Sequence, residues 1–443
     1  MSLKKDAGDT YIELDSRVGS PNDRGYKPIK KKRGNNIEHY FFGPRDITRH
    51  SRIPFFFRIH GSVLPHLIIP FTLYSIWTTG ATLILHFYFR HHQFDNVLLT
   101  VLGFLVGLTL SFRNQTAYSR YDEGRKYWSQ LTLISSNLSR VIWSHAKERE
   151  GEEGKEDLLA KITFLNLIKA FSLAVKHRLR YEPYTNYPDI QPYISYLDTY
   201  SRAATAATPI TTPKVSKLMR LGETLGITFL EPNPRAALKN ARAPLGNLPL
   251  EMLVHMQSYV DSIIANGTLK ANICQIQSIT SLQILNDIAC GTDRIANTPI
   301  PIAYSITIAQ ISWAYILLLP FQLYSKLKLQ TIPASLLAAY IILGLATIGT
   351  EIENPFGDGV NDLPLDIFCD SIAEEVDILM SRPVMGSSKA FGVDDNMPLW
   401  PLSRSGWATW EERSVDDIRG ALKSKVVVRR RVKTDTVQIN PRV

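Results

Sequence analysis

The chain has 443 residues, of which 45% are hydrophobic and 21% charged, and this balance excludes a wholly disordered protein. Its 25 glycines and 25 prolines exclude a collagen-like chain. The net charge of +9 lies at the two ends, because residues 1–60 carry +6, residues 421–443 carry +6 and residues 61–420 carry −3. We therefore expect no nucleic acid among its partners.

Four long apolar runs follow the basic N-terminal segment 1–60. They lie at 61–85, 96–112, 295–325 and 329–350. Each has a core near the length of about 20 residues that crosses the hydrocarbon of a bilayer. Because the runs form two closely linked pairs, the sequence predicts two transmembrane hairpins, at 61–113 and 299–350.

Basic residues flank these hairpins unevenly. They are frequent in the N-terminal flank and in the segment that follows the second run, and sparse in the two short links. The positive-inside rule therefore predicts a multi-pass protein with both termini and the middle segment in the cytosol. We expect the plasma membrane as its location, with an organelle membrane as the alternative.

The middle segment, 114–298, shows helical periodicity and predicts a large cytosolic domain. A stretch at about 181–248, rich in Pro, Tyr, Thr and Ser, is expected to be a surface insertion. Asn266-Gly267 is expected to interrupt the last long helical stretch. The C-terminal segment, 351–443, combines an acidic turn with a basic tail. The three cysteines are far apart, which predicts free thiols.

Phe104, Leu108 and Phe112 share one helix face because their spacing is i, i+4, i+8. Packing or lipid-facing side chains fit this spacing, and so does a hydrophobic pore constriction formed by several copies of the helix. Gly103 and Gly107 would let another helix approach an adjacent face.

Three arginines, Arg113, Arg120 and Arg125, follow this stripe. They fit either juxtamembrane cations beside interfacial aromatic residues or a positive vestibule that concentrates anions.

The turn after the fourth run is rich in oxygen-bearing side chains. Asn354, Asp358, Asn361 and Asp362 fit a calcium loop or ordinary Asx-turn chemistry. A rival interpretation is a membrane enzyme. Its metal site would consist of Glu351, Glu353, Asp358 and Asp362. No known catalytic motif is present, so we expect no enzyme.

Four segments together resemble the bestrophin family, and most closely its bacterial, fungal and plant anion channels. They are FRNQTAYSRYDEGRKYW (112–128), CGTDRIANTPIPIAY (290–304), LPF (319–321) and EIENPFGDGVNDLPLD (351–366). The resemblance covers about residues 50–380. It implies an all-α membrane protein, a homopentamer around one central pore, with four transmembrane helices and a large helical cytosolic domain per subunit.

The resemblance also assigns roles to individual residues. It places the pore neck at Phe104, Leu108 and Phe112 and a second, cytosolic constriction at Ile273. Glu351, Asn354 and Asp362 match calcium-ligand positions of animal members, but Gly359 replaces one carboxylate, so only a remnant of the calcium clasp is implied.

We therefore expect a homopentameric channel that passes chloride and similar inorganic anions passively across a lipid bilayer, without a cofactor and with calcium uncertain. The alternatives are a cation-conducting relative, a membrane enzyme with an acidic metal site, and a membrane scaffold.

Overall fold

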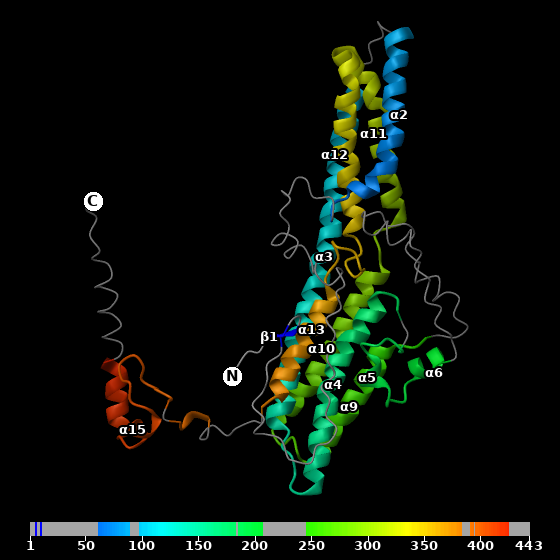
Figure 1. Ribbon diagram of the computed structural model, residues 1–443. Coiled ribbons are helices and arrows are strands. Elements are labelled where there is room, and N and C mark those ends of the chain that lie inside the picture. The colour runs from blue at the N-terminus through cyan, green and yellow to red at the C-terminus, as the bar shows by residue number, and fades with distance from the viewer. Residues whose placement is uncertain are drawn as a thin grey trace, which may run out of the picture. The chain divides into compact units, whose positions relative to one another are not determined.

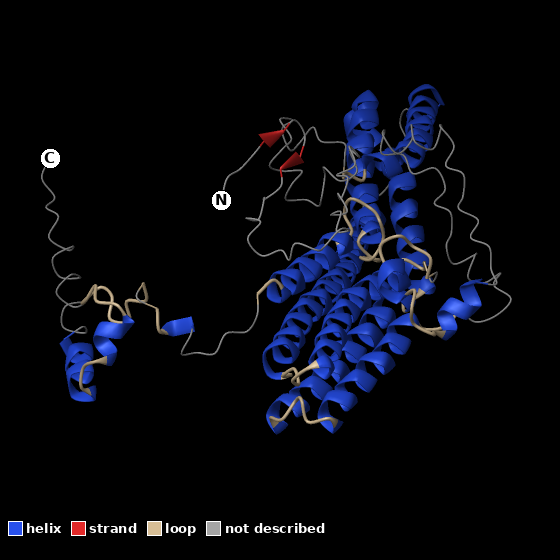
Figure 2. Ribbon diagram, turned by 60° about the horizontal axis from the view of Figure 1, so that its bottom comes forward, coloured by secondary structure: helices blue, strands red, loops and turns tan. Residues whose placement is uncertain are grey.

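A computed structural model describes residues 5–6, 9–10, 61–88, 97–182, 185–206, 245–382, 390–393 and 395–424. The chain divides into two compact units, Met1–His50 and Ser51–Val443. In the first unit, strands β1 (Lys5–Asp6) and β2 (Asp9–Thr10) pair antiparallel. The all-α prediction did not include this short pair. In the second unit, the described regular elements are helices (Figure 2).

The second unit contains several long helices and a few short ones (Figure 1). They are α2 (Leu64–Tyr88), α3 (Val97–His145), α4 (Glu152–Leu179), α5 (Gln191–Ile194), α6 (Tyr200–Ala206), α9 (Leu248–Ala265), α10 (Asn272–Asn297), α11 (Ile302–Leu327), the 3₁₀ helix η4 (Lys328–Gln330), α12 (Thr331–Glu351), α13 (Leu365–Met380) and α15 (Trp407–Glu411). A further helical stretch covers 415–424. Of the expected insertion, 207–244 lies outside the described residues.

Three described helical stretches are long and apolar enough to cross a membrane: Leu64–Tyr88, Glu152–Leu179 and Ile302–Glu351. The first is α2. The last contains α11 and α12, joined by η4, at the position of the second predicted hairpin. The expected second span forms the beginning of α3, whose first 16 residues carry no charge. The total of four spans stays a prediction.

Helix α4 has the hydropathy of a membrane span but lies in the protein core. In its most apolar window, 61% of the residues are buried inside the protein. Three buried lysines on α4 reach carboxylates on other segments: Lys161 binds Glu148, Lys169 binds Asp377, and Lys176 binds Asp189 and Asp366. Because these ion pairs tie α4 to polar neighbours along its length, we assign it to the helical body rather than the bilayer.

Helix α3 links two separate cores. Its first part packs on α11 and α12 through small apolar clusters, and its second part contributes to one large core with α4, α9, α10 and α13. The domain boundary expected at residue 113 lies inside this unbroken helix of 49 residues. Neither proline nor a capping motif interrupts α3 there, so the helix continues through the change of environment.

The predicted break at Asn266-Gly267 separates α9 from α10. Gly267 has a φ of 72°, which favours glycine, and the side-chain oxygen of Asn266 accepts hydrogen bonds from Thr268. The three cysteines are free, as predicted. Cys274 and Cys369 are buried, and burial raises the pKa of the Cys369 thiol to about 12.

Phe356, in the turn after α12, fills a space beside α3. Its side chain is fully buried in the large core. A Cβ atom on Gly124 of α3 would lie 3.0 Å from the Phe356 ring, so the glycine permits this close contact. The turn is therefore fixed against the second half of α3 by apolar packing.

We expect Phe356→Ala to lower the free energy of unfolding by about 3–5 kcal/mol, because it removes a fully buried ring. The thermal unfolding midpoint of the detergent-solubilised protein measures this loss. Leu159→Ala is the control, since Leu159 is an exposed apolar residue of α4, and its midpoint should stay close to that of the parent. Equal midpoints for the two variants would contradict the packing role of Phe356.

Candidate functional site

The face of α3 predicted to line a pore points away from the other described helices of the chain. Phe104, Leu108 and Phe112 are 68%, 40% and 57% exposed. On another face of the same helix, Val106 and Leu110 are buried in a cluster with Ile308 of α11. One face of α3 thus packs against the rest of the chain, and the other presents large apolar side chains to the surroundings of the chain.

Val101 extends this exposed face, and the sequence reasoning missed it. It is 52% exposed and lies three residues before Phe104 and seven before Leu108, which places it on the same side of the helix. The spacing in the sequence was sufficient to find it. We call the set Val101, Phe104, Leu108 and Phe112 the α3 stripe.

Gly103 and Gly107, the two glycines near the start of α3, have different surroundings. A Cβ atom on Gly103 would lie 3.1 Å from the ring of Tyr315, so Gly103 allows α11 to approach α3 closely. A Cβ atom on Gly107 would meet no atom of the described residues within 4 Å. The predicted close approach is therefore seen at Gly103, and the structure shows no contact that requires Gly107.

Arg113 follows the stripe directly, but its side chain is buried and only 7% exposed. Its Nη2 donates a hydrogen bond of 3.0 Å to Oγ1 of Thr350, next to the last residue of α12. Among the described residues, no carboxylate forms an ion pair with Arg113. The negative end of the α12 helix dipole stabilises the charge in part.

A glycine near the end of α12 makes room for this arrangement. A Cβ atom on Gly349 would lie 2.5 Å from Oδ1 of Asn114 and 3.5 Å from Cδ of Arg113. Neither Nε of Arg113 nor Oδ1 of Asn114 has a hydrogen-bond partner among the described residues. The part of α3 that follows its uncharged first 16 residues therefore begins with buried polar side chains, some of whose atoms lack a hydrogen-bond partner among the described residues.

Arg120 binds backbone carbonyl groups from two other segments. Its Nε donates to Glu353 at 3.0 Å, its Nη2 to Ile295 at 2.5 Å, and its Nη1 to Thr298. The side chain thus connects α3 to the end of α10 and to the turn after α12. Arg120 has a clear structural role, in addition to the charge on which the vestibule hypothesis depends.

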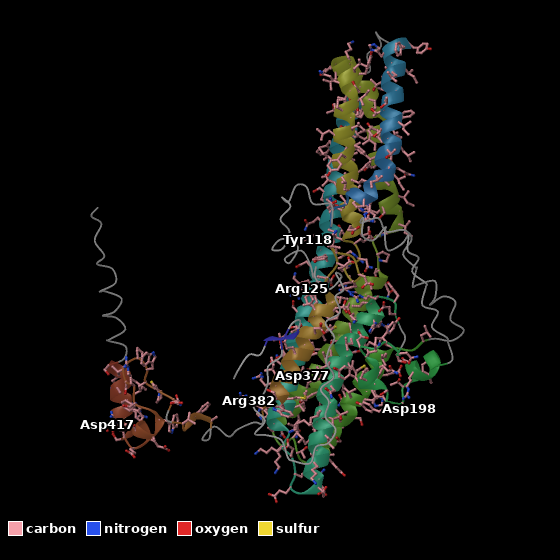
Figure 3. All side chains as sticks on the ribbon, viewed as in Figure 1. Tyr118, Arg125, Asp198, Asp377, Arg382 and Asp417 are labelled. Atoms are coloured by element: carbon pink, nitrogen blue, oxygen red, sulfur yellow. The ribbon has the colours of Figure 1, made fainter. Side chains whose placement is uncertain are left out.

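Arg125 lies on the surface of α3, below Tyr118 in Figure 3. Its guanidinium carbon is 4.4 Å from the centre of the Phe368 ring of α13, and Nη1 donates to Ser129 Oγ at 2.7 Å. Of the three predicted arginines, Arg125 is therefore the one whose side chain is open to solvent.

The turn after α12 directs several of its oxygen atoms to protein donors. Oδ2 of Asp362 accepts the Gly359 amide at 2.8 Å, and Oε1 of Glu353 accepts the Ile300 amide at 3.0 Å. Asp358 forms an ion pair of 2.8 Å with Arg180 of the segment after α4. These contacts are those expected of a turn stabilised by its own side chains.

No metal cluster is evident at this turn. Glu351 ends α12 and is half-buried, whereas Asn354 is exposed. Within the described ranges, no group of three or more His, Cys, Asp or Glu side chains is placed to hold a metal ion. The structure therefore offers no support for the acidic site of a membrane enzyme, and calcium binding at Glu351, Asn354 and Asp362 stays a prediction.

Basic residues at the end of α4 bind a carboxylate of the segment before α5 and another in the first turn of α13. Nζ of Lys176 lies 2.6 Å from Asp189 and 2.9 Å from Asp366, and Arg180 also binds Asp366, at 2.9 Å. Burial alone would lower the pKa of Lys176, but hydrogen bonds to the two carboxylates raise it above its ordinary value. The sequence analysis did not identify this cluster, because its members are distant in the chain.

His177 occupies the same region and is held between two carboxylates. Its Nδ1 lies 2.7 Å from Glu182 and its Nε2 lies 3.0 Å from Asp189, while its ring stacks on Tyr187. Burial alone would lower the pKa of His177, but hydrogen bonds with Asp189 and Glu182 raise it above the ordinary value. His177 is therefore a group whose protonation favours the folded body.

Ile273, the predicted second constriction, lies near the start of α10 and is exposed. Ile276, three residues later, is exposed on the same helix face. Like the α3 stripe, this pair presents apolar side chains away from the described helices of the chain. A constriction at Ile273 stays a prediction.

Comparisons with known proteins agree with the resemblance found in the sequence. The family profile described as Bacterial/Fungal Bestrophin protein matches residues 44–378. A protein of Nostoc named voltage-dependent anion channel-forming protein is 32% identical over 296 residues, covering 67% of this chain and 81% of that protein. A protein of the same description from Escherichia coli strain K12 is 27% identical over 321 residues, covering 72% and 88%.

A solved structure shows the same fold. The crystal structure of a bacterial bestrophin homologue from Klebsiella pneumoniae matches with a TM-score of 0.52 and 21% identity. The match covers 72% of this chain and all of that chain.

We expect the thermal stability of the protein to fall as the pH rises above about 6.5. The stabilisation by protonated His177 is complete below its unfolded pKa of about 6.5 and is lost as the pH rises through the higher folded-state pKa. Thermal unfolding midpoints measured in detergent should therefore depend less on pH in His177→Gln than in the parent protein. His145→Gln, which changes an exposed histidine of α3, is the control. If the unfolding midpoints of the parent and of His177→Gln depend on pH in the same way, protonation of His177 does not stabilise the fold.

Proposed function

Because this chain belongs to the family of bacterial and fungal bestrophin proteins, we propose that it forms an anion channel in the membrane that its apolar helices cross. The observation that carries the proposal is the α3 stripe. It consists of large apolar side chains that the subunit's own helices leave exposed, on a helix fixed from another side by α11. The names of the relatives in Nostoc and Escherichia coli support the same function.

In the proposed assembly, five copies of the chain surround one axis and each contributes the α3 stripe to the neck. Rings formed by Phe104, Leu108 and Phe112 would narrow the pore without placing a charge in it. Such a constriction controls conduction by excluding water and favours ions that lose their hydration shell easily. Ile273 of each subunit would form a second apolar ring in the cytosolic part of the pore.

The positive charge behind the neck favours the permeation of anions over that of cations. Arg113 follows Phe112 directly, and no described carboxylate pairs with it. An unpaired charge in a buried position is screened less than an exposed charge, so it contributes more to the potential at the mouth of the neck. Arg120 and Arg125 add positive charge farther along α3. Chloride and similar small anions are the proposed permeant ions.

We also propose that both termini and the helical body face the cytosol. The basic residues that flank the hairpins support this orientation. In this arrangement, α3 carries the pore from the bilayer into the cytosolic body without a break.

The triple variant Phe104→Ala, Leu108→Ala and Phe112→Ala should increase single-channel conductance or open probability several-fold, because it widens and wets the neck. Recording of purified protein in planar bilayers tests this. The matched control is Ile69→Ala, Leu73→Ala and Ile76→Ala, which truncates an exposed apolar stripe of α2. If both triple variants conduct like the parent, the α3 stripe does not line the pore.

Arg113→Gln should lower the chloride-to-potassium permeability ratio by about two- to tenfold, whereas Arg113→Lys should preserve it because the charge is retained. Reversal potentials across a potassium chloride gradient measure the ratio. Arg125→Gln removes an exposed arginine from the same helix and should have a smaller effect. A parent channel whose reversal potential follows the potassium gradient would overturn the anion assignment itself.

A further inference from the structure

The face of α3 that carries the α3 stripe continues beyond the neck residues and becomes charged. Asp122 lies 18 residues after Phe104, and Lys126 lies 18 residues after Leu108. Because 18 residues make about five full turns, the two charged residues share the face of the stripe, about 27 Å farther along the helix. Both side chains are open to solvent, and Nζ of Lys126 lies 2.6 Å from Oδ2 of Asp122.

Helix α10, which packs along the second part of α3, brings a second exposed face to the same region. Arg294 lies 18 residues after Ile276, so it shares the helix face that exposes Ile273 and Ile276. Its guanidinium forms an ion pair with Glu123, which lies 11 residues, or about three turns, after Phe112 on α3. The ion pair therefore joins the two exposed faces at the point where α10 meets α3.

The position of Arg294 is fixed by two side chains of α3. A Cβ atom on Gly291, three residues earlier in α10, would collide with the ring of Tyr127, so the glycine allows Tyr127 to lie against α10. The side chain of Tyr127 forms a hydrogen bond with Arg294. Tyr127 and Glu123 thus hold the guanidinium between them, and its charge stays beside the carboxylate.

The two ion pairs determine the charge of this surface. Exposed ion pairs contribute little to the stability of a fold, so their loss should not unfold the chain. Their two positive and two negative charges cancel. Without Lys126 and Arg294, each subunit would place two uncompensated carboxylates, those of Asp122 and Glu123, beyond the neck. Rings of carboxylates attract cations into the pores of cation channels.

We propose that Lys126 and Arg294 are specificity-determining residues of the channel. Each neutralises a carboxylate of α3 beside the path of the ions, and the potential at the mouth of the neck thereby stays favourable to anions. This inference rests on the proposed anion channel. It assigns part of the ion selectivity to side chains that act through the charge of Asp122 and Glu123.

Reversal potentials of the full-length protein in planar bilayers, across a potassium chloride gradient, test the proposal. Arg294→Gln and Lys126→Gln should each lower the chloride-to-potassium permeability ratio about two- to threefold, because each leaves a carboxylate uncompensated in every subunit. The reduction should shrink at about 1 M salt, where the screening length falls to about 3 Å. Lys155→Gln is the matched control, since it breaks an exposed ion pair with Glu152 at the start of α4 and should leave the ratio unchanged.

A second substitution separates the effect of charge from a structural effect. Adding Glu123→Gln to Arg294→Gln should restore the permeability ratio of the parent, because the net charge of the pair is again zero. Adding Asp122→Asn to Lys126→Gln should do the same. A ratio that stays low in both double variants would mean that the single substitutions disturb the pore itself, and the proposal would be wrong.

The same recordings distinguish a failure of this inference from a failure of the proposed channel. A parent protein that selects potassium over chloride would overturn both. If the parent selects chloride and both single variants keep its permeability ratio, the result supports the anion channel and refutes the role of Lys126 and Arg294.

Discussion

One helix must satisfy two environments, and the rest of the structure is arranged around that requirement. Helix α3 begins as an uncharged segment packed on α11 and continues without interruption into a polar body. A rigid helix of 49 residues spans about 75 Å, so a displacement at one end is transmitted to the other. The apolar bundle and the helical body are therefore mechanically connected through α3.

The turn after α12 secures this connection at the level where the environment changes. Arg120 of α3 binds the Glu353 carbonyl, and Phe356 fills the space beside Gly124. From the other side, Arg180 binds Asp358 of the same turn. The acidic turn is thus held by α3 and by the end of α4 together. Its carboxylates have a structural purpose that does not depend on a bound cation.

The sequence was informative where a pattern is local and periodic. The apolar runs, the break at Asn266-Gly267 and the exposed face that includes Phe104 could all be predicted from spacing. Contacts between residues distant in the chain could not be predicted in this way. Nothing in the sequence around Arg113 indicates that its side chain is buried against Thr350, and Lys176 and Asp366 are 190 residues apart. These contacts depend on how the helices pack, which composition and periodicity do not specify.

The lysines of α4 also influence whether this helix is inserted into the membrane during synthesis of the chain. As it leaves the ribosome, α4 offers the membrane insertion machinery a segment as apolar as a true span. A lysine near the centre of such a segment, as Lys169 is, opposes insertion by about 2.5–3.5 kcal/mol. The side chain that pairs with Asp377 in the folded protein thus also disfavours the insertion of α4 into a bilayer before its partner has been synthesised. Replacing it with leucine would remove an ion pair and, in addition, a signal that decides topology.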